Sequence, residues 1–161
     1  MSELALQLIR ENKQKRARGE DAGFLDLGNC GLTEVPEEIG ELVWLETLSF
    51  SSKWWDWNKV NITNNTGRAN KLKRLTLIPS VSALTKIKIL MGDSVKPKPI
   101  SRLKNLKKLK KLRLSELSDL DDLSPLSGLT SLERLDVSET RVTDLSPLSG
   151  LKLLEKGFST G

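Results

Sequence analysis

Apolar residues along this chain recur in a short frame, LxxLxLxx, whose intervening positions are mostly polar. Copies of the frame, some complete and some weaker, begin at residues 22, 45, 87, 109, 132 and 154. The last two apolar positions of the frame are two residues apart, so both point to the same face of an extended segment. The pattern therefore predicts a series of short strands, each with one face turned to a core and the other turned outward.

One eight-residue segment of the sequence is repeated without change. Residues 122–129 read DLSPLSGL, and residues 144–151 read DLSPLSGL again, 22 residues later. A fixed period of this length indicates a repeat protein, because one unit cannot bury its own apolar face and must stack on the next. We expect the strands to form a parallel sheet that lines a concave surface, with the leucines of each return segment closing the core behind it.

Residues 22–161 resemble the leucine-rich-repeat family. Residues 132–151 follow the LxxLxLxxNxIxDLxPLxxL pattern of the internalin-like class, with Thr140 in the asparagine place, and the first unit is similar to the LxxLPxxI type. The mixture of units and the Trp-rich segment also resemble the amino-terminal repeat regions of bacterial Roc-COR GTPases. The resemblance implies an α/β fold, a right-handed leucine-rich-repeat solenoid whose parallel concave sheet binds proteins.

The resemblance also implies a ladder of buried asparagines that hydrogen-bond the backbone of adjacent turns. Cys30 and Thr140 occupy the asparagine place in their units and can supply weaker donors. Lys53, Val95 and Leu117 occupy it in three others and cannot act in that way. We therefore expect an irregular ladder through the middle of the solenoid.

The spacing of the units indicates an insertion in the second one. Four gaps between unit starts are 22 or 23 residues and one is 42. We place the insertion at residues 54–73, followed by a tail that echoes the first unit. A competing interpretation makes the apolar residues at 72, 75 and 77 a separate strand. The predicted tail consists of Leu75, Ile78, Pro79, Val81 and Leu84.

The two ends of the chain are predicted to differ. In residues 1–21, Ser2 can cap a helix that carries Leu4, Ala5, Leu8 and Ile9 on one face and ends at Gly19, and such a helix would cover the first repeat. At the other end the sixth unit is incomplete. The apolar flank of the fifth unit, which includes Leu135, Val137 and Leu148, is therefore expected to be an open edge, relieved by further repeats in a longer chain, by self-association or by Phe158 folded back as a plug.

Composition narrows the possible chemistry. The chain has no histidine and one cysteine, Cys30, which excludes a Ser-His-Asp triad, an imidazole metal site and an internal disulfide. The sequence has no P-loop, and the paired acids Asp121 and Asp122 have no third ligand nearby. We therefore expect no catalysis, cofactor or metal. With no signal peptide and no apolar run long enough to span a membrane, the expected location is the cytoplasm.

Candidate partner-binding residues fall into two groups. One is the Trp-rich segment Trp54, Trp55 and Trp57, which either presents aromatic anchors at the rim of the concave face or packs on neighbouring repeats. The other group consists of outward-facing strand positions. These are an apolar spot of Phe24, Ile89 and Met91, a basic spot of Lys111, Arg113 and Arg134, and the neighbouring Asp136.

Charge adds a third hypothesis. The net charge is +5, but residues 58–113 hold 16 bases and 1 acid. The run at 100–113 reads as a convex helix whose leucines (Leu103, Leu106, Leu109 and Leu112) face the core and whose lysines are solvated. The alternative is an anion-binding belt. No aromatic residues interleave the lysines, so we expect a protein partner rather than a specific nucleic acid. A further alternative is a regulatory segment of a larger signalling protein such as a Roc-COR GTPase.

Overall fold

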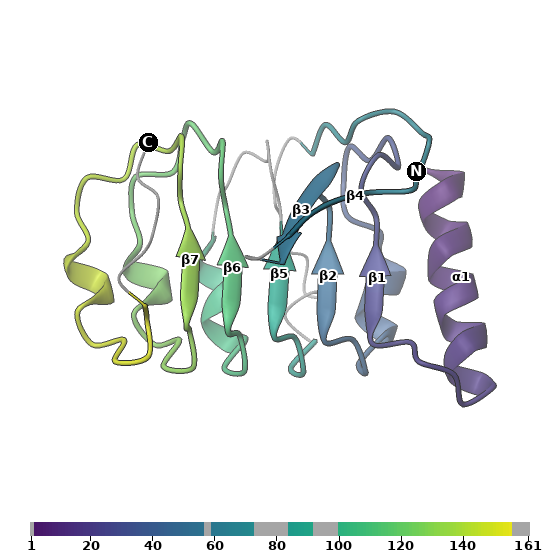
Figure 1. Cartoon of the computed structure of the whole chain (residues 1–161), viewed down its shortest axis with the longest axis horizontal. Coiled ribbons are helices and arrows are strands. Elements are labelled where there is room, and N and C mark those ends of the chain that lie inside the picture. The colour runs from purple at the N-terminus through teal and green to yellow at the C-terminus, as the bar shows by residue number, and fades with distance from the viewer. Residues whose placement is uncertain (1, 57–58, 73–83, 92–99, 156–161) are drawn as a thin grey trace.

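Five short parallel strands lie side by side in the computed structural model, which describes residues 2–56, 59–72, 84–91 and 100–155 (Figure 1). Their order in the sheet is the order of the chain, and the register aligns the central leucine of each strand with that of the next. The strands predicted from the LxL frame are confirmed. They are β1 (Phe24–Asp26), β2 (Thr47–Ser49), β5 (Ile89–Met91), β6 (Lys111–Arg113) and β7 (Arg134–Asp136).

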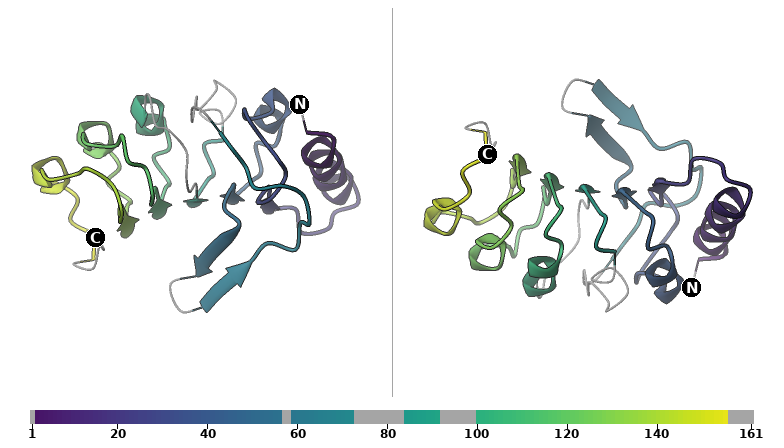
Figure 2. Two further views of the ribbon diagram at one scale, coloured as in Figure 1. Left: turned by 90° about the horizontal axis from the view of Figure 1, so that it is seen from above. Right: turned by 90° about the horizontal axis from the view of Figure 1, so that it is seen from below.

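The return segments form short 3-10 helices on the opposite side of the core (Figure 2). The two identical DLSPLSGL segments fold alike, because Asp122 and Asp144 each accept a hydrogen bond from the backbone N–H two residues on, at 2.8 and 2.9 Å. The predicted leucine-rich-repeat solenoid with an N-terminal helical cap is confirmed. The 3-10 helices are η1 (Glu37–Glu41), η2 (Ile100–Asn105), η3 (Ser124–Leu126) and η4 (Ser146–Leu148).

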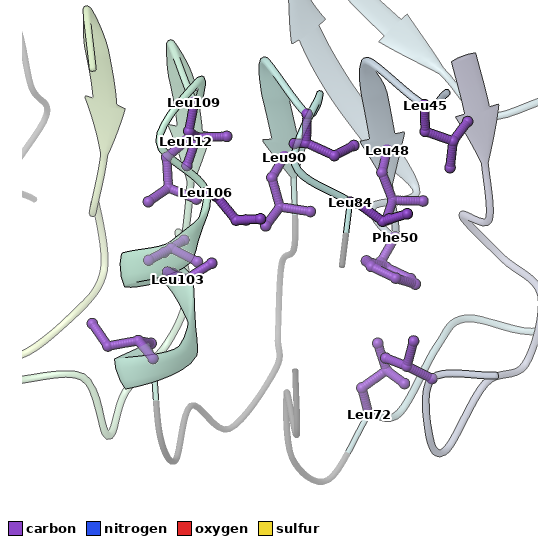
Figure 3. Close-up of a cluster of buried hydrophobic side chains, with 14 of the residues drawn as sticks. Leu45, Leu48, Phe50, Leu72, Leu84, Leu90, Leu103, Leu106, Leu109 and Leu112 are labelled. Carbon is purple, nitrogen blue, oxygen red and sulfur yellow. The ribbon is translucent and has the colours of Figure 1, made fainter. Parts of the chain in front are cut away.

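Leucines from the strands and the return segments fill the space between them (Figure 3). Leu103, Leu106, Leu109 and Leu112, which recur every third residue, are all fully buried. The lysines between them, Lys104, Lys107, Lys108 and Lys110, are exposed. This run therefore belongs to the repeat frame, as its spacing predicts, and its charges lie on the surface.

The predicted cap is the helix α1 (Glu3–Ala17), which covers the first repeat. The Ser2 hydroxyl accepts a hydrogen bond from Ala5 N at 3.4 Å and donates one to the Cys30 carbonyl, which joins the start of the helix to the first repeat. Ala5 and Ile9 are buried, and Gly19 follows the helix with a φ of 75°. The helix is thus held by packing along its length and by a polar contact at its N-terminus.

A buried asparagine fastens the middle of α1. The Asn12 amide donates to the carbonyls of Ala22 and Phe24, each at 3.1 Å, and accepts from Trp44 Nε1 at 2.9 Å. The Asn12 side chain is 4% exposed, and its bond to the Ala22 carbonyl is fully buried. Asn12 therefore connects the cap to β1 and to the turn that precedes β2.

The expectation of an open apolar edge at the fifth unit is wrong. Leu135, Val137 and Leu148 are only 3%, 1% and 6% exposed. The described start of the sixth unit contributes to this cover, since Leu154 packs on the same core and Glu155 N donates to Glu133 O at 2.9 Å. The apolar surface from which self-association was predicted is therefore covered, and the predicted plug, Phe158, lies outside the described residues.

The insertion lies between Phe50 and Asn70, earlier than the predicted end at residue 73. Asn70 lies beside Cys30, and these two residues are 40 positions apart in the sequence. The paired strand residues Leu25 and Leu48 are 23 positions apart, so the insertion adds 17 residues, the difference between 40 and 23. Leu72, which the prediction placed in the insertion, is a buried core residue.

The start of the third unit follows the predicted frame. Leu84 is buried and its carbonyl accepts a hydrogen bond from Ile87 N, as that of Leu42 does from Leu45 N. The other residues of the predicted tail, Leu75, Ile78, Pro79 and Val81, lie outside the described residues. So does most of the competing strand.

Candidate functional site

The strand register places outward-facing residues of the concave sheet in two rows. The first row runs along the starts of the strands and the second along their ends. All ten residues in the rows lie at positions that the alternation of the LxL frame turns outward. The first row is Phe24, Thr47, Ile89, Lys111 and Arg134, and the second is Asp26, Ser49, Met91, Arg113 and Asp136.

The first row changes from aromatic to basic along the solenoid. Phe24 is 43% exposed, and the other four residues are partly exposed. Arg134 at the far end forms an ion pair with Glu155, in which Nε and Oε2 are 3.1 Å apart. The row therefore offers an apolar contact over β1 and basic side chains over β6 and β7.

The second row is less accessible than the alternation predicts. Met91 is 2% exposed and Ser49 is fully buried, so the predicted apolar spot is reduced to Phe24 and Ile89. Alternation identifies which face a residue lies on, but its exposure depends on what else lies over that face. Met91 cannot contact a partner unless the surrounding residues move.

Arg113 and Asp136 bind each other rather than facing solvent. Their Nε and Oδ2 atoms are 3.3 Å apart, and Arg113 Nε also donates to Ser115 Oγ at 2.9 Å. Asp136 Oδ1 accepts from the hydroxyl and the backbone N–H of Ser138 at 2.7 and 3.0 Å. Since Arg113 is 9% exposed, these two charges join β6 to β7 and supply little free charge to the surface.

A two-stranded antiparallel hairpin stands on the concave side of the sheet (Figure 2). It consists of β3 (Lys53–Asp56) and β4 (Lys59–Ile62), and its register pairs Trp54 with Asn61 and Trp55 with Val60. Trp57 lies outside the described residues. The sequence predicted an insertion at the rim of this face but not its hairpin form. Ile62, at the base of the hairpin, is 66% exposed.

The hairpin is fastened to the first repeat at its base. Thr63 N donates to Ser52 O at 3.0 Å, which closes the stem, and the Asn65 amide donates to Asp26 O and Gly28 O at 3.1 and 2.9 Å. Gly28 allows the base of the hairpin to lie close to the first repeat, because a Cβ at this position would be 2.2 Å from Ser51 O and 3.0 Å from Thr63 Cβ. The spacing of the repeat frame gives no signal for this anchoring role of Asn65.

Asn70 restores the ladder that Lys53 was predicted to interrupt. Its Nδ2 donates to Leu27 O and Phe50 O, both at 2.8 Å, and its Oδ1 accepts from Cys30 N and Leu32 N at 3.2 and 2.9 Å. The insertion has carried the asparagine of the second unit away from the frame. The donor predicted at Thr140 is also present, since its hydroxyl donates to Val137 O at 2.6 Å.

The described residues contain no group of acids or cysteines that could hold a metal ion, and no helix among them is long and apolar enough to cross a bilayer. Burial, together with the nearby Asp26 carboxylate, raises the pKa of the Cys30 thiol to about 11. The thiol is therefore protonated at neutral pH and unsuited to act as a nucleophile. Hydrogen bonds from the Ser124 hydroxyl and N–H lower the pKa of Asp122, which leaves it an ordinary ionised capping residue.

Comparison with known proteins supports the repeat fold. No protein-family model and no curated protein sequence matches the chain. Among solved structures it is similar to an internalin (inlF) of Listeria monocytogenes, with a TM-score of 0.57 and 28% identity over 75% of this chain and 30% of that one. It is also similar to internalin C2 of the same bacterium, with a TM-score of 0.53 and 23% identity over 75% of this chain and 54% of that one.

This chain therefore spans less than two thirds of the length of either internalin. In this chain the leucine-rich-repeat solenoid consists of the repeated LxxLxLxx frame, five parallel strands and short return helices. The chain is a leucine-rich-repeat protein.

Proposed function

We propose that this chain is a protein-binding module whose partner contacts the concave strand face and the β3–β4 hairpin together. The observation that carries the proposal is the position of the hairpin, which stands on the same side of the sheet as the exposed row (Figure 2). Two of the large exposed apolar residues, Phe24 and Ile62, belong to this side. The leucine-rich-repeat fold commonly mediates protein–protein interaction, which agrees with this surface.

The partner's chemistry follows from the first row. Phe24 and Ile89 favour an apolar side chain on the partner, and Lys111 favours an acidic one near β6. Trp54, Trp55 and Trp57 are proposed anchors because tryptophan is enriched at interface hot spots. Arg113 and Asp136 would act indirectly, by holding β6 and β7 in register under the partner.

A hairpin of two strands is at best marginally stable alone in water. Here the anchoring at its base by Asn65 lowers the entropy that a partner must overcome to order it. This preparation of the hairpin supports a role in binding. The buried, free Cys30 fits the reducing cytoplasm as the proposed location.

Site-specific photo-crosslinking in the source cell tests the proposal. A photoreactive phenylalanine analogue is placed at Ile62 or Lys111 on the concave side, and at Ser127 on the convex side as the control. We expect one protein to be captured from both concave positions and not from Ser127. Capture of the same proteins from all three positions, or of different proteins from the two concave ones, would refute a shared concave surface.

A further inference from the structure

The turns that precede β2, β5, β6 and β7 and the equivalent turn of the sixth unit form one edge of the solenoid, which we call the lower edge (Figure 1). Each turn has the same backbone hydrogen bond, from its fourth residue to its first, at 2.9 to 3.2 Å. The residues that follow the turns are linked from unit to unit by further backbone bonds, so neighbouring turns lie side by side. The five turns are residues 42–45, 84–87, 106–109, 129–132 and 151–154.

The lower edge is positively charged and has no acid in its turns. The two middle positions of the five turns include four lysines, all of them exposed. Within the described part of the chain none of the four lies in an ion pair, and Lys107 donates only to the Gly128 carbonyl, at 3.1 Å. They are Lys86, Lys107, Lys108 and Lys152.

Carboxylates beside the lower edge are already neutralised. Glu46 pairs with Lys88 and Glu133 with Lys110, with N···O distances of 2.9 and 2.7 Å. Glu155 pairs with Arg134 in the same way. These pairs leave the charge of the turn lysines uncompensated.

The C-terminal half of α1 extends the lower edge beyond the first repeat. The guanidinium of Arg16 lies over the ring of Trp44, in the first turn of the edge, 5.9 Å from its centroid. Lys15 adds a second exposed base, while Arg18 is paired with Glu20. The acid Asp21 also lies at this end, but the two bases Lys15 and Arg16 outnumber it, so the region has a net positive charge.

Exposed apolar side chains stand at the two ends of the same edge. Val43 in the first turn is 50% exposed, and Leu153 in the last is 57% exposed. They occupy the same middle positions of the turn as the lysines. The edge thus combines the turn lysines with one apolar side chain in its first turn and one in its last.

We propose that the lower edge docks on an anionic phospholipid surface. Lysines near such a surface are attracted by its negative potential, and apolar side chains beside them enter the boundary between headgroups and acyl chains. Adjacent units of a parallel sheet are about 4.8 Å apart, so five turns span roughly 20 Å along a nearly straight line, which suits a flat partner. A nucleic-acid duplex would use only the cations and would leave Val43 and Leu153 without a role.

This orientation leaves the concave face and the hairpin free. A chain docked by its lower edge would hold the surface proposed for a protein partner perpendicular to the bilayer. Membrane docking would therefore locate the module at a bilayer, and it can be tested independently of the protein partner on the concave face.

The proposal is tested by co-sedimentation with phosphatidylcholine vesicles, with and without about 30% phosphatidylserine, at 50, 150 and 500 mM NaCl. We expect binding only to the anionic vesicles, and weaker binding as salt rises. Each lysine near the surface contributes about a fivefold change in partitioning, so Lys86→Gln combined with Lys108→Gln should weaken it tenfold or more. The matched control, Lys53→Gln with Lys71→Gln, removes the same charge outside the lower edge and should change binding less than threefold.

Two further measurements distinguish lipid from other polyanions. Val43→Ser with Leu153→Ser should weaken binding to anionic vesicles and leave retention on heparin unchanged, and a circular-dichroism melt confirms that each variant is folded. No binding to anionic vesicles at 50 mM NaCl would overturn the proposal, as would an equal loss in the control. So would duplex DNA binding that is tighter than vesicle binding at the same salt concentration.

Discussion

Replacing Asn70 with alanine should destabilise the protein more than any other asparagine substitution in the insertion. The Asn70 amide makes four hydrogen bonds to backbone atoms of two repeats, with lengths from 2.8 to 3.2 Å. Each contributes about 0.5–1.5 kcal/mol net, and a buried group that loses its partner costs about 1–3 kcal/mol. Because Asn70 is half-buried and water can reach part of the site, we expect a loss of about 2–4 kcal/mol in the free energy of unfolding.

The insertion contains its own graded controls. The Asn65 amide donates two hydrogen bonds to backbone carbonyls, and the exposed Asn64 makes none with the described residues. Asn65→Ala should therefore cost about half as much as Asn70→Ala, and Asn64→Ala less than about 0.5 kcal/mol. The three variants change the same residue type within seven positions, so they differ mainly in the hydrogen bonds removed.

Urea denaturation followed by far-ultraviolet circular dichroism measures the series. The expected order of destabilisation is Asn70 first, Asn65 second and Asn64 last. A loss below about 0.5 kcal/mol for Asn70→Ala would refute the ladder role. An order that does not follow the number of hydrogen bonds would show that the insertion is held mainly by other contacts.

Leu135→Ala removes a buried strand residue and should cost about 2–5 kcal/mol in urea denaturation, and a loss under about half a kcal/mol would mean that the strand register is wrong. Because the folded protein lowers the pKa of Asp122, ionised Asp122 stabilises the fold at any pH above the ordinary aspartate pKa of about 4. Stability should therefore fall as the pH drops through the lowered pKa, and Asp122→Asn should remove that part of the pH dependence. Gly28→Ala places a Cβ against the carbonyl of a neighbouring unit and should cost about 1–3 kcal/mol or more, as judged by the melting temperature; an unchanged melting temperature would contradict the close approach. Cys30 should react with a thiol reagent at pH 8 far more slowly in the native protein than in urea, and equal rates would contradict its burial and raised pKa.

The elements that the sequence predicts correctly are those set by local spacing. Apolar residues two apart define the strands, and Ser2 with the apolar residues that follow defines the cap helix. The strands depend on contacts that recur in every unit. A frame of eight residues is enough to contain them.

The errors arise where distant segments of chain meet. Asn70 performs the task of the position held by Lys53 in the frame, and spacing alone does not reveal that an insertion has moved it. Met91 lies on the outward face as predicted, yet it is buried, because exposure depends on the surroundings as well as on register. Val137 is covered for the same reason at the other end of the solenoid.

Because the hairpin is anchored at its base, its outer part can be replaced by another sequence. Thr63 N and Ser52 O join the two legs of the stem, and every anchoring contact described above lies below that pair. Because the entropy of closing a loop grows slowly with its length, the segment between residues 52 and 63 can be longer, shorter or different in sequence at little cost to the repeats beneath. Relatives of this chain could diverge there while keeping one solenoid. The same position is a natural place to graft a foreign binding loop.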